Sequence, residues 1–245
     1  LVNFNNCIDI HKLISLYEDV CKFIVVDNSK DYIQCSNEVI ITPDDNVGYI
    51  GGFKLAVKSL DNHSQYKLIF SNSDIEIIDG ITEFIEGDQN EGTVLIPRII
   101  SPNGEQNPHI FVRKKKVYWV IRFVASKNNF FWYLWNLLVN IRKNDFYRFK
   151  PRKLLASQNV YAGHGSFFIF NCIDFSEFNI GTHNFLYGEE VHLAEYFYAK
   201  GIAVFFNPSL VVQHIEHTST SFLKNNVRRS FFHDSYKSII SKYYI

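Results

Sequence analysis

The 245-residue sequence has few cysteines and no long apolar run, and both absences narrow the class of protein. Four cysteines without a Cys-x-x-Cys pair are too sparse for a disulfide framework, so we expect a reducing, cytoplasmic compartment. The nearest candidate for a membrane span, Phe130 to Val139, is interrupted by Asn136 and falls short of the roughly 20 residues that a spanning helix needs. With 47% hydrophobic and 20% charged residues, the chain is expected to form one cored globular domain.

Net charge is absent as well, since 25 basic residues balance 25 acidic ones. The balance is uneven along the chain, because residues 113–153 hold twelve basic residues and only Asp145 as an acid. All three tryptophans lie in this basic aromatic segment. Cations beside tryptophan-rich apolar surface are typical of an anionic membrane interface. A buried helical subdomain and an RNA-binding surface remain alternatives.

Strand-like runs alternate with helical patterns over most of the chain, which predicts an α/β fold with a mainly parallel sheet. The expected strands are 1–4, 22–26, 39–41, 67–70, 166–170, 203–206 and 210–212. The expected helices are 8–20, 48–60, one that starts near Glu189, and 225–244.

Polar clusters follow several of these strands, where open α/β sheets place their ligands. Asp27 closes the second strand, and its carboxylate is suited to a ribose or base but equally to a turn. Asn46 and the glycines 48, 51 and 52 precede a helix, in a spacing that fits a tight loop better than a nicotinamide dinucleotide site. Asn72-Ser73-Asp74 places an acid suited to Mg²⁺ or Mn²⁺ after the fourth strand, although a turn cap has the same pattern.

Two further groups lie in the second half of the chain. Glu189 and Glu190 precede an amphipathic helical pattern. Acids at this position are typical partners of a helix dipole, and the alternative is a general base over a cleft. His214 and His217 lack the helical spacing of a catalytic zinc site, but a single histidine is compatible with an octahedral metal site.

Taken in order, these motifs resemble family 2 glycosyltransferases of the GT-A fold. Val25-Val26-Asp27-Asn28 and Asn72-Ser73-Asp74 resemble the nucleotide-sugar half of that family. Residues 163–166, residues 185–190, and His214 with Ser219 resemble the acceptor half of bacterial members that build capsule and lipopolysaccharide, such as rhamnosyl- or galactofuranosyltransferases. The resemblance covers nearly the whole chain, and it depends on the order and spacing of the motifs.

The resemblance implies a donor site in the first half of the chain. It implies that Phe4 packs against the nucleotide base and that Asp27 binds the base or ribose. The same pocket would include Asn46, Gly51, Gly52 and Asn72. Asp74 would hold a divalent cation, Mg²⁺ or Mn²⁺, with His214 as a further ligand.

For the second half, the resemblance implies that Glu190 is the general base, with Glu189 as a credible substitute, and that His164 contacts the acceptor. The implied organisation is a single GT-A domain with a Rossmann-like sheet, in which residues 1–112 bind the donor, residues 113–158 form a basic aromatic insertion and residues 159–245 bind the acceptor.

The resemblance implies an inverting transfer from a UDP- or dTDP-linked sugar to a saccharide, in particular a lipid-linked one. We expect no nucleic-acid partner, and a location in the cytoplasm or at the inner face of the membrane. The alternative is a catalytically weak scaffold of a polysaccharide assembly complex, and Glu190 and Asp74 separate the two, because only an enzyme needs them for transfer.

Overall fold

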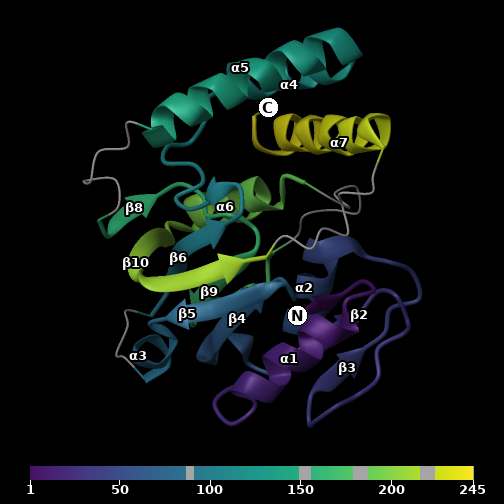
Figure 1. Cartoon of the computed structure of the whole chain (residues 1–245), viewed down its shortest axis with the longest axis vertical. Helices are drawn as coiled ribbons and strands as arrows, with labels where there is room; N and C mark the ends of the chain where they lie inside the picture. Colours follow the sequence, from purple (N-terminus) through teal and green to yellow (C-terminus); the bar gives the residue numbers. More distant parts are fainter. Residues whose placement is uncertain (87–90, 149–155, 179–186, 216–223, 245) are drawn as a thin grey trace.

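Two β-sheets and the helices around them make up the fold, as Figure 1 shows for the computed structural model. The structure describes residues 1–86, 91–148, 156–178, 187–215 and 224–244. The smaller sheet contains β1 (Val2–Asn3), β2 (Ile24–Asp27) and β3 (Val39–Ile41), all parallel. Helix α1 (Cys7–Tyr17) connects β1 to β2, and α2 (Gly48–Lys58) follows β3.

The larger sheet is mixed, and its strand order is β4-β9-β6-β10-β5. Among the described strands of this sheet, only β6 and β10 pair in parallel, and the other strand pairs of the same sheet are antiparallel. The short strands β7 and β8 pair with β6 and β10. The bounds are β4 Lys67–Ser71, β5 Ile75–Asp79, β6 Thr93–Ser101, β7 Gly104–Glu105, β8 Gln158–Val160, β9 Phe167–Asn171 and β10 Ala203–His214.

Both faces of the larger sheet are apolar, because its central strands are apolar at successive positions. In β9, Phe168 and Phe170 face one core, and Phe167 and Ile169 face the other. The first face packs against α2 and against α6 (Glu189–Lys200). The second face packs against Ile81 of the short α3 (Ile81–Glu86). The sheet therefore holds α6, and with it the glutamate pair, in a fixed position over its first face.

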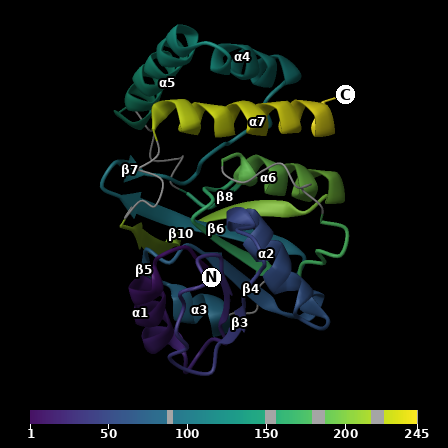
Figure 2. The ribbon, with the colours of Figure 1, turned by 90° about the vertical axis from the view of Figure 1, so that its right-hand side faces the viewer.

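A layer of three helices lies beyond α6. Its members are α4 (Lys116–Ser126), α5 (Asn129–Arg148) and α7 (Asn225–Tyr243). Figure 2 shows α7 between the α4–α5 pair and α6. Trp119 of α4 and Trp132 of α5 pack with Tyr236 and Ile239 of α7 in one apolar cluster. The basic aromatic segment is thus joined to the C-terminal part of the chain.

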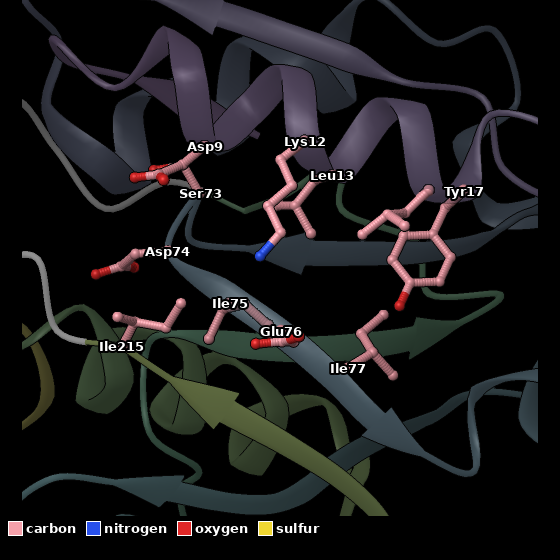
Figure 3. Close-up of a pocket in the computed structure, with 11 residues that line it drawn as sticks. Asp9, Lys12, Leu13, Tyr17, Ser73, Asp74, Ile75, Glu76, Ile77 and Ile215 are labelled. Carbon is pink, nitrogen blue, oxygen red and sulfur yellow. The ribbon is translucent and has the colours of Figure 1, made fainter.

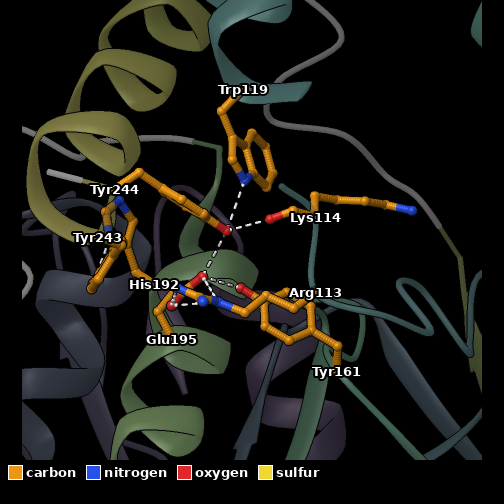
Figure 4. A network of polar contacts seen from close by, with 8 residues as sticks. All are labelled: Arg113, Lys114, Trp119, Tyr161, His192, Glu195, Tyr243 and Tyr244. Atoms are coloured by element: carbon orange, nitrogen blue, oxygen red, sulfur yellow. Dashed lines mark hydrogen bonds and ion pairs between the residues drawn. The ribbon is translucent and has the colours of Figure 1, made fainter. Parts of the chain in front are cut away.

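One buried carboxylate ties this helical layer to α6 (Figure 4). Glu195 of α6 accepts hydrogen bonds from the Arg113 guanidinium at 2.8 to 3.1 Å and from the Tyr161 hydroxyl at 2.7 Å. The Tyr244 hydroxyl lies 3.0 Å from the same carboxylate and accepts a hydrogen bond from Trp119 Nε1. The hydrogen bonds that Arg113 donates to Glu195 raise the pKa of Arg113 above its ordinary value.

The expected α/β class, with a central sheet flanked by helices, is confirmed by this architecture. The expectation of mainly parallel pairing holds for the smaller sheet and for β6–β10 but is wrong for the rest of the larger sheet. The physical reason is that β4 and β9 pair antiparallel without a βαβ crossover, a mode that strand-like sequence runs do not distinguish.

We predict that Arg113→Met lowers the free energy of unfolding by about 3 kcal/mol, because it leaves the Glu195 carboxylate, 3% exposed, without its cation. Urea denaturation measures this change. The matched control is Arg98→Met, which removes the more exposed ion pair with Glu105 and should cost less than about 1 kcal/mol. Equal losses in the two variants would contradict the role given to Glu195.

Candidate active site

A carboxylate and an imidazole meet where β4 and β10 end. Asp74 follows β4 and leads into β5, and His214 is the last residue of β10. Asp74 Oδ1 lies 3.3 Å from His214 Nε2, and both side chains are less than 10% exposed. The Ile215 amide donates to the Asp74 carbonyl at 3.0 Å, which fixes the two segments side by side. The structure therefore brings together the two residues that the sequence proposed as metal ligands.

The partners of His214 favour the tautomer in which Nε2 carries a lone pair and acts as an acceptor. The other ring nitrogen, Nδ1, lies 2.9 Å from Gln106 Oε1, so Nδ1 is the natural donor in that pair. The Asn72 side-chain amide then donates to Nε2 at 3.3 Å. In this arrangement Asp74 Oδ1 and His214 Nε2 are two acceptors that face each other, which a cation or a proton between them would stabilise.

The residues present fit one side of a divalent cation site. A carboxylate oxygen and a neutral imidazole nitrogen are ligands suited to Mn²⁺, and oxygen ligands of a diphosphate would complete an octahedron. Among the residues that the structure describes, no group of three or more His, Cys, Asp or Glu side chains is placed to hold a metal on its own. Any cation at Asp74 and His214 would therefore need ligands from the substrate.

The glutamate pair lies at the first turn of α6, close to the loop that carries His164. A Cβ atom built on Gly165 would lie 3.4 Å from Glu190 Oε1 and 3.6 Å from Glu189 Cγ, which are ordinary van der Waals distances, so the glutamate pair lies directly against this residue. The preceding residue of the loop, His164, has its ring centroid 5.8 Å from that of His214. The loop thus connects the Asp74–His214 pair to the glutamate pair.

Burial and mutual repulsion keep one proton on the glutamate pair. Burial, followed by the neighbouring charge of Glu190, raises the pKa of Glu189 to about 8. Two interacting carboxylates titrate as a unit, so near neutral pH the pair holds one proton and one negative charge.

Tyr49 at the start of α2 lies near these carboxyl groups, and no motif in the sequence indicated it. Its hydroxyl is buried and has no hydrogen-bond partner among the described residues, and its ring stacks on Phe70 with centroids 4.3 Å apart. Burial, and then the charges of Glu189, Asp74 and Glu190, raise the pKa of Tyr49 well above its ordinary value. A neutral hydroxyl donor therefore sits among three carboxyl groups.

Asp27 is engaged by its own loop. Its Oδ1 accepts from Asn3 Nδ2 at 2.8 Å and its Oδ2 accepts from the Tyr32 amide at 3.0 Å. Burial alone would raise the pKa of Asp27, but these hydrogen bonds and those from Ser29 outweigh it and the pKa lies below its ordinary value. The turn-forming alternative thus describes the contacts of Asp27, and its contact with a nucleotide stays a prediction.

Phe4 lies at the end of β1, and its side chain is 43% exposed. The same segment reaches the metal loop, because Asn6 Nδ2 donates to Ser73 Oγ at 3.2 Å. The structure therefore places the exposed Phe4 ring in a segment that contacts the loop carrying Asp74, while stacking on a base stays a prediction.

The glycine loop serves the packing and start of α2. Asn46 Oδ1 accepts from the Gly48 amide at 2.9 Å and so shapes the turn before the helix. A Cβ on Gly52 would lie 2.7 Å from Val2 Cγ2, and one on Gly51 would lie 2.9 Å from Val47 Cβ. The close backbone approach seen here is made to other residues of the chain, and ligand contacts of Asn46, Gly51 and Gly52 stay predictions.

A groove between α1 and β5 leads to Asp74, as Figure 3 shows. Asp9, Lys12 and Tyr17 of α1 line one side, and Glu76 of β5 lines the other. The Lys12 ammonium points into the groove from α1. Phe185, Leu186, His217 and Ser219, which belong to motifs named in the sequence analysis, lie outside the described residues.

Comparisons with known proteins give little guidance. No family model matches the chain, and no curated protein matches it. One solved structure that it resembles is the crystal structure of GalNAc-T7 with UDP, GalNAc and Mn2+, at a TM-score of 0.46 and 11% sequence identity. The match covers 79% of this chain, which spans 37% of the length of that chain. At this level of similarity, the function has to be inferred from the residues of this chain.

We predict that Glu189→Gln weakens the pH dependence of stability. A carboxyl whose pKa is raised on folding stabilises the folded state below its unfolded pKa, about 4.5, and this contribution is lost as the pH rises through about 8. The variant should therefore lose less stability than the parent chain between pH 5 and pH 9, by on the order of 2 kcal/mol. Urea denaturation at the two pH values tests this, and parallel losses in both proteins would contradict the raised pKa.

Proposed function

We propose that this chain is an inverting glycosyltransferase of the GT-A type, which moves a sugar from a UDP- or dTDP-linked donor to a hydroxyl group of a saccharide. The observation that carries the proposal is the convergence of the Asp74–His214 pair and the Glu189–Glu190 pair on the loop at His164 and Gly165. One pair is suited to the leaving diphosphate and the other to a proton, which are the two ends of a glycosyl transfer.

At the donor end, Asp74 and His214 would hold Mg²⁺ or Mn²⁺ together with the diphosphate. Their separation of 3.3 Å and the tautomer favoured by Gln106 direct a carboxylate oxygen and an imidazole lone pair to the same point. When bound, the cation would stabilise the negative charge that develops on the diphosphate as the sugar leaves. The exposed ring of Phe4 is available to stack on the base of the nucleotide.

At the acceptor end, Glu190 would act as the general base. A base must be ionised before the reaction, and with the proton of the pair on Glu189, whose pKa is raised by burial and by the charge of Glu190, Glu190 would be ionised. Its Oε1 faces the Gly165 loop. His164 precedes Gly165 on the same loop and would contact the acceptor.

The proposed reaction is a single displacement. The acceptor oxygen forms a bond to the anomeric carbon while Glu190 takes the hydroxyl proton. The bond between the anomeric carbon and the diphosphate oxygen breaks, and the nucleoside diphosphate leaves with the electron pair. Attack from the face opposite the leaving group inverts the anomeric configuration and needs no covalent intermediate with the protein.

We further propose that the acceptor is a lipid-linked saccharide in the assembly of a bacterial surface polysaccharide at the cytoplasmic face of the membrane. The support is the motif order in residues 163–190, which resembles the acceptor half of capsule and lipopolysaccharide enzymes.

Titration calorimetry with UDP and with dTDP, each with Mn²⁺ or with a chelator, tests the donor site. We expect micromolar binding of one nucleotide that requires Mn²⁺, and a loss of at least tenfold in affinity for Asp74→Asn, because the substitution removes a charged ligand of the cation. Failure of both nucleotides to bind would contradict the donor site.

The matched variant for the second role is Glu190→Gln. It should bind the same nucleotide as the parent chain but lower kcat for sugar transfer or donor hydrolysis by 10² to 10⁴, about the size of a lost general base. The exposed Glu177→Gln serves as control. Donor binding without turnover in the parent chain would favour the scaffold alternative.

A further inference from the structure

The outer surface of the α4–α5 pair exposes apolar side chains that no described element covers. In α4 the exposed residues recur at helical spacing and form one stripe, made by Val117, Val120, Ile121 and Val124. The opposite face of α4 carries Trp119 and Phe123, which pack toward α7. An isolated soluble helix pair would not need apolar residues on both faces.

The neighbouring helix continues the apolar surface. Trp132 of α5 packs inward with the α7 cluster. Among the described side chains of α5, the exposed apolar ones lie on the other side of the helix and are Phe130, Phe131, Tyr133, Leu134, Leu137 and Leu138. We call the two sets together the outer apolar face. Figures 1 and 2 show both helices as the outermost layer, on the side of the molecule away from the smaller sheet.

The charged residues in this part of the chain are all positive, although Arg122 packs inward on Tyr236. Residues 112–138 contain six basic residues and no acidic one. Arg113 is occupied by Glu195 and is therefore not available to a partner. Lys115 and Lys116 at the start of α4, and Lys127 after its end, are exposed. Cations therefore flank the apolar stripe at both ends.

We propose that the outer apolar face of α4 and α5 binds in the interface of an anionic lipid bilayer, with the lysines at the level of the headgroups. An apolar face flanked by cations is the arrangement that such a surface favours. A second copy of the chain is disfavoured, because a two-fold interface on this face would bring the lysines of both copies together. RNA is disfavoured, because seven of the ten residues of the outer apolar face are aliphatic and cannot stack on bases.

This binding mode would be peripheral. No helix in the described part of the chain is long and apolar enough to cross a bilayer. Since α7 lies between the outer apolar face and α6, and Val191 of α6 packs with Tyr236 of α7, the glutamate pair would lie one helix layer below the membrane. The inference does not depend on the proposed function, because it concerns a different surface.

Co-sedimentation with vesicles tests the proposal. The probes are phosphatidylcholine vesicles and phosphatidylcholine vesicles with about one third phosphatidylglycerol. We expect binding to the anionic vesicles, a loss of about fivefold per lysine for Lys116→Gln and Lys127→Gln, and a loss of at least tenfold for Ile121→Gln combined with Leu134→Gln. The control Ile33→Gln with Val39→Gln removes exposed apolar residues elsewhere and should leave binding unchanged.

Circular dichroism and thermal denaturation show whether each variant is folded, and the substituted side chains are exposed, so we expect no change. Absence of vesicle binding by the parent chain, or equal loss in the control, would overturn the proposal. Sedimentation velocity gives a second reading: a dimer of the parent chain that Ile121→Gln with Leu134→Gln dissociates would assign the outer apolar face to self-association.

Discussion

The arrangement of the second half of the chain depends on the hydrogen bonds that the buried carboxylate of Glu195 accepts. Its hydrogen bonds join the segment before α4, the loop after β8, helix α6 and the end of α7. Because a buried charge without partners is costly, these segments are stable only when they are assembled together. The same helix begins with the glutamate pair, so the interaction that attaches the helical layer also fixes where Glu189 and Glu190 point. Helix α6 therefore carries both the structural carboxylate and the proposed catalytic pair. Gly188, which precedes the helix, has a φ of +82° and lies against Ser235, so a side chain at this position would clash.

The candidate active site is formed by residues that lie next to the ends of strands in the larger sheet. Asp74 and His214 are far apart in the chain, but Asp74 lies between the end of β4 and the start of β5, His214 ends β10, and the Ile215 amide holds the two segments together. The His164–Gly165 loop precedes β9, which lies between β4 and β6, so it arrives at the same edge as Asp74. The position of this loop is fixed because the side chains of β9, which follows it, pack into the apolar core on both faces of the sheet. A polar site thus forms at the margin of a sheet whose interior is almost wholly apolar.

Sequence patterns predicted the residues at these strand ends but not their surroundings. The apolar run at β9 and the glycine-led helix α2 are local signals, and the structure has both. Strand β6 was not predicted, because Pro97 lies in its middle and a proline argues against a central strand. In the structure Pro97 lies where the pairing of β6 with β10 is irregular, and beyond the part of β6 that pairs with β9. Tyr49 and Gln106 carry no motif, and their place in the site arises only from packing of α2 on β4 and from the β6–β7 turn. Asp27 was identified, but the hydrogen bonds of its own loop depend on Asn3, which is distant in sequence.

The central claim is that Asp74 and His214 hold a cation against the diphosphate of a nucleotide-sugar. Anomalous diffraction at the manganese edge, from crystals grown with Mn²⁺ and the nucleotide that binds, tests it most directly. The account predicts one strong peak between Asp74 Oδ1 and His214 Nε2, at about 2.0–2.3 Å from each, with diphosphate oxygens completing the coordination. A nucleotide bound elsewhere, or a peak that touches neither residue, would contradict the account.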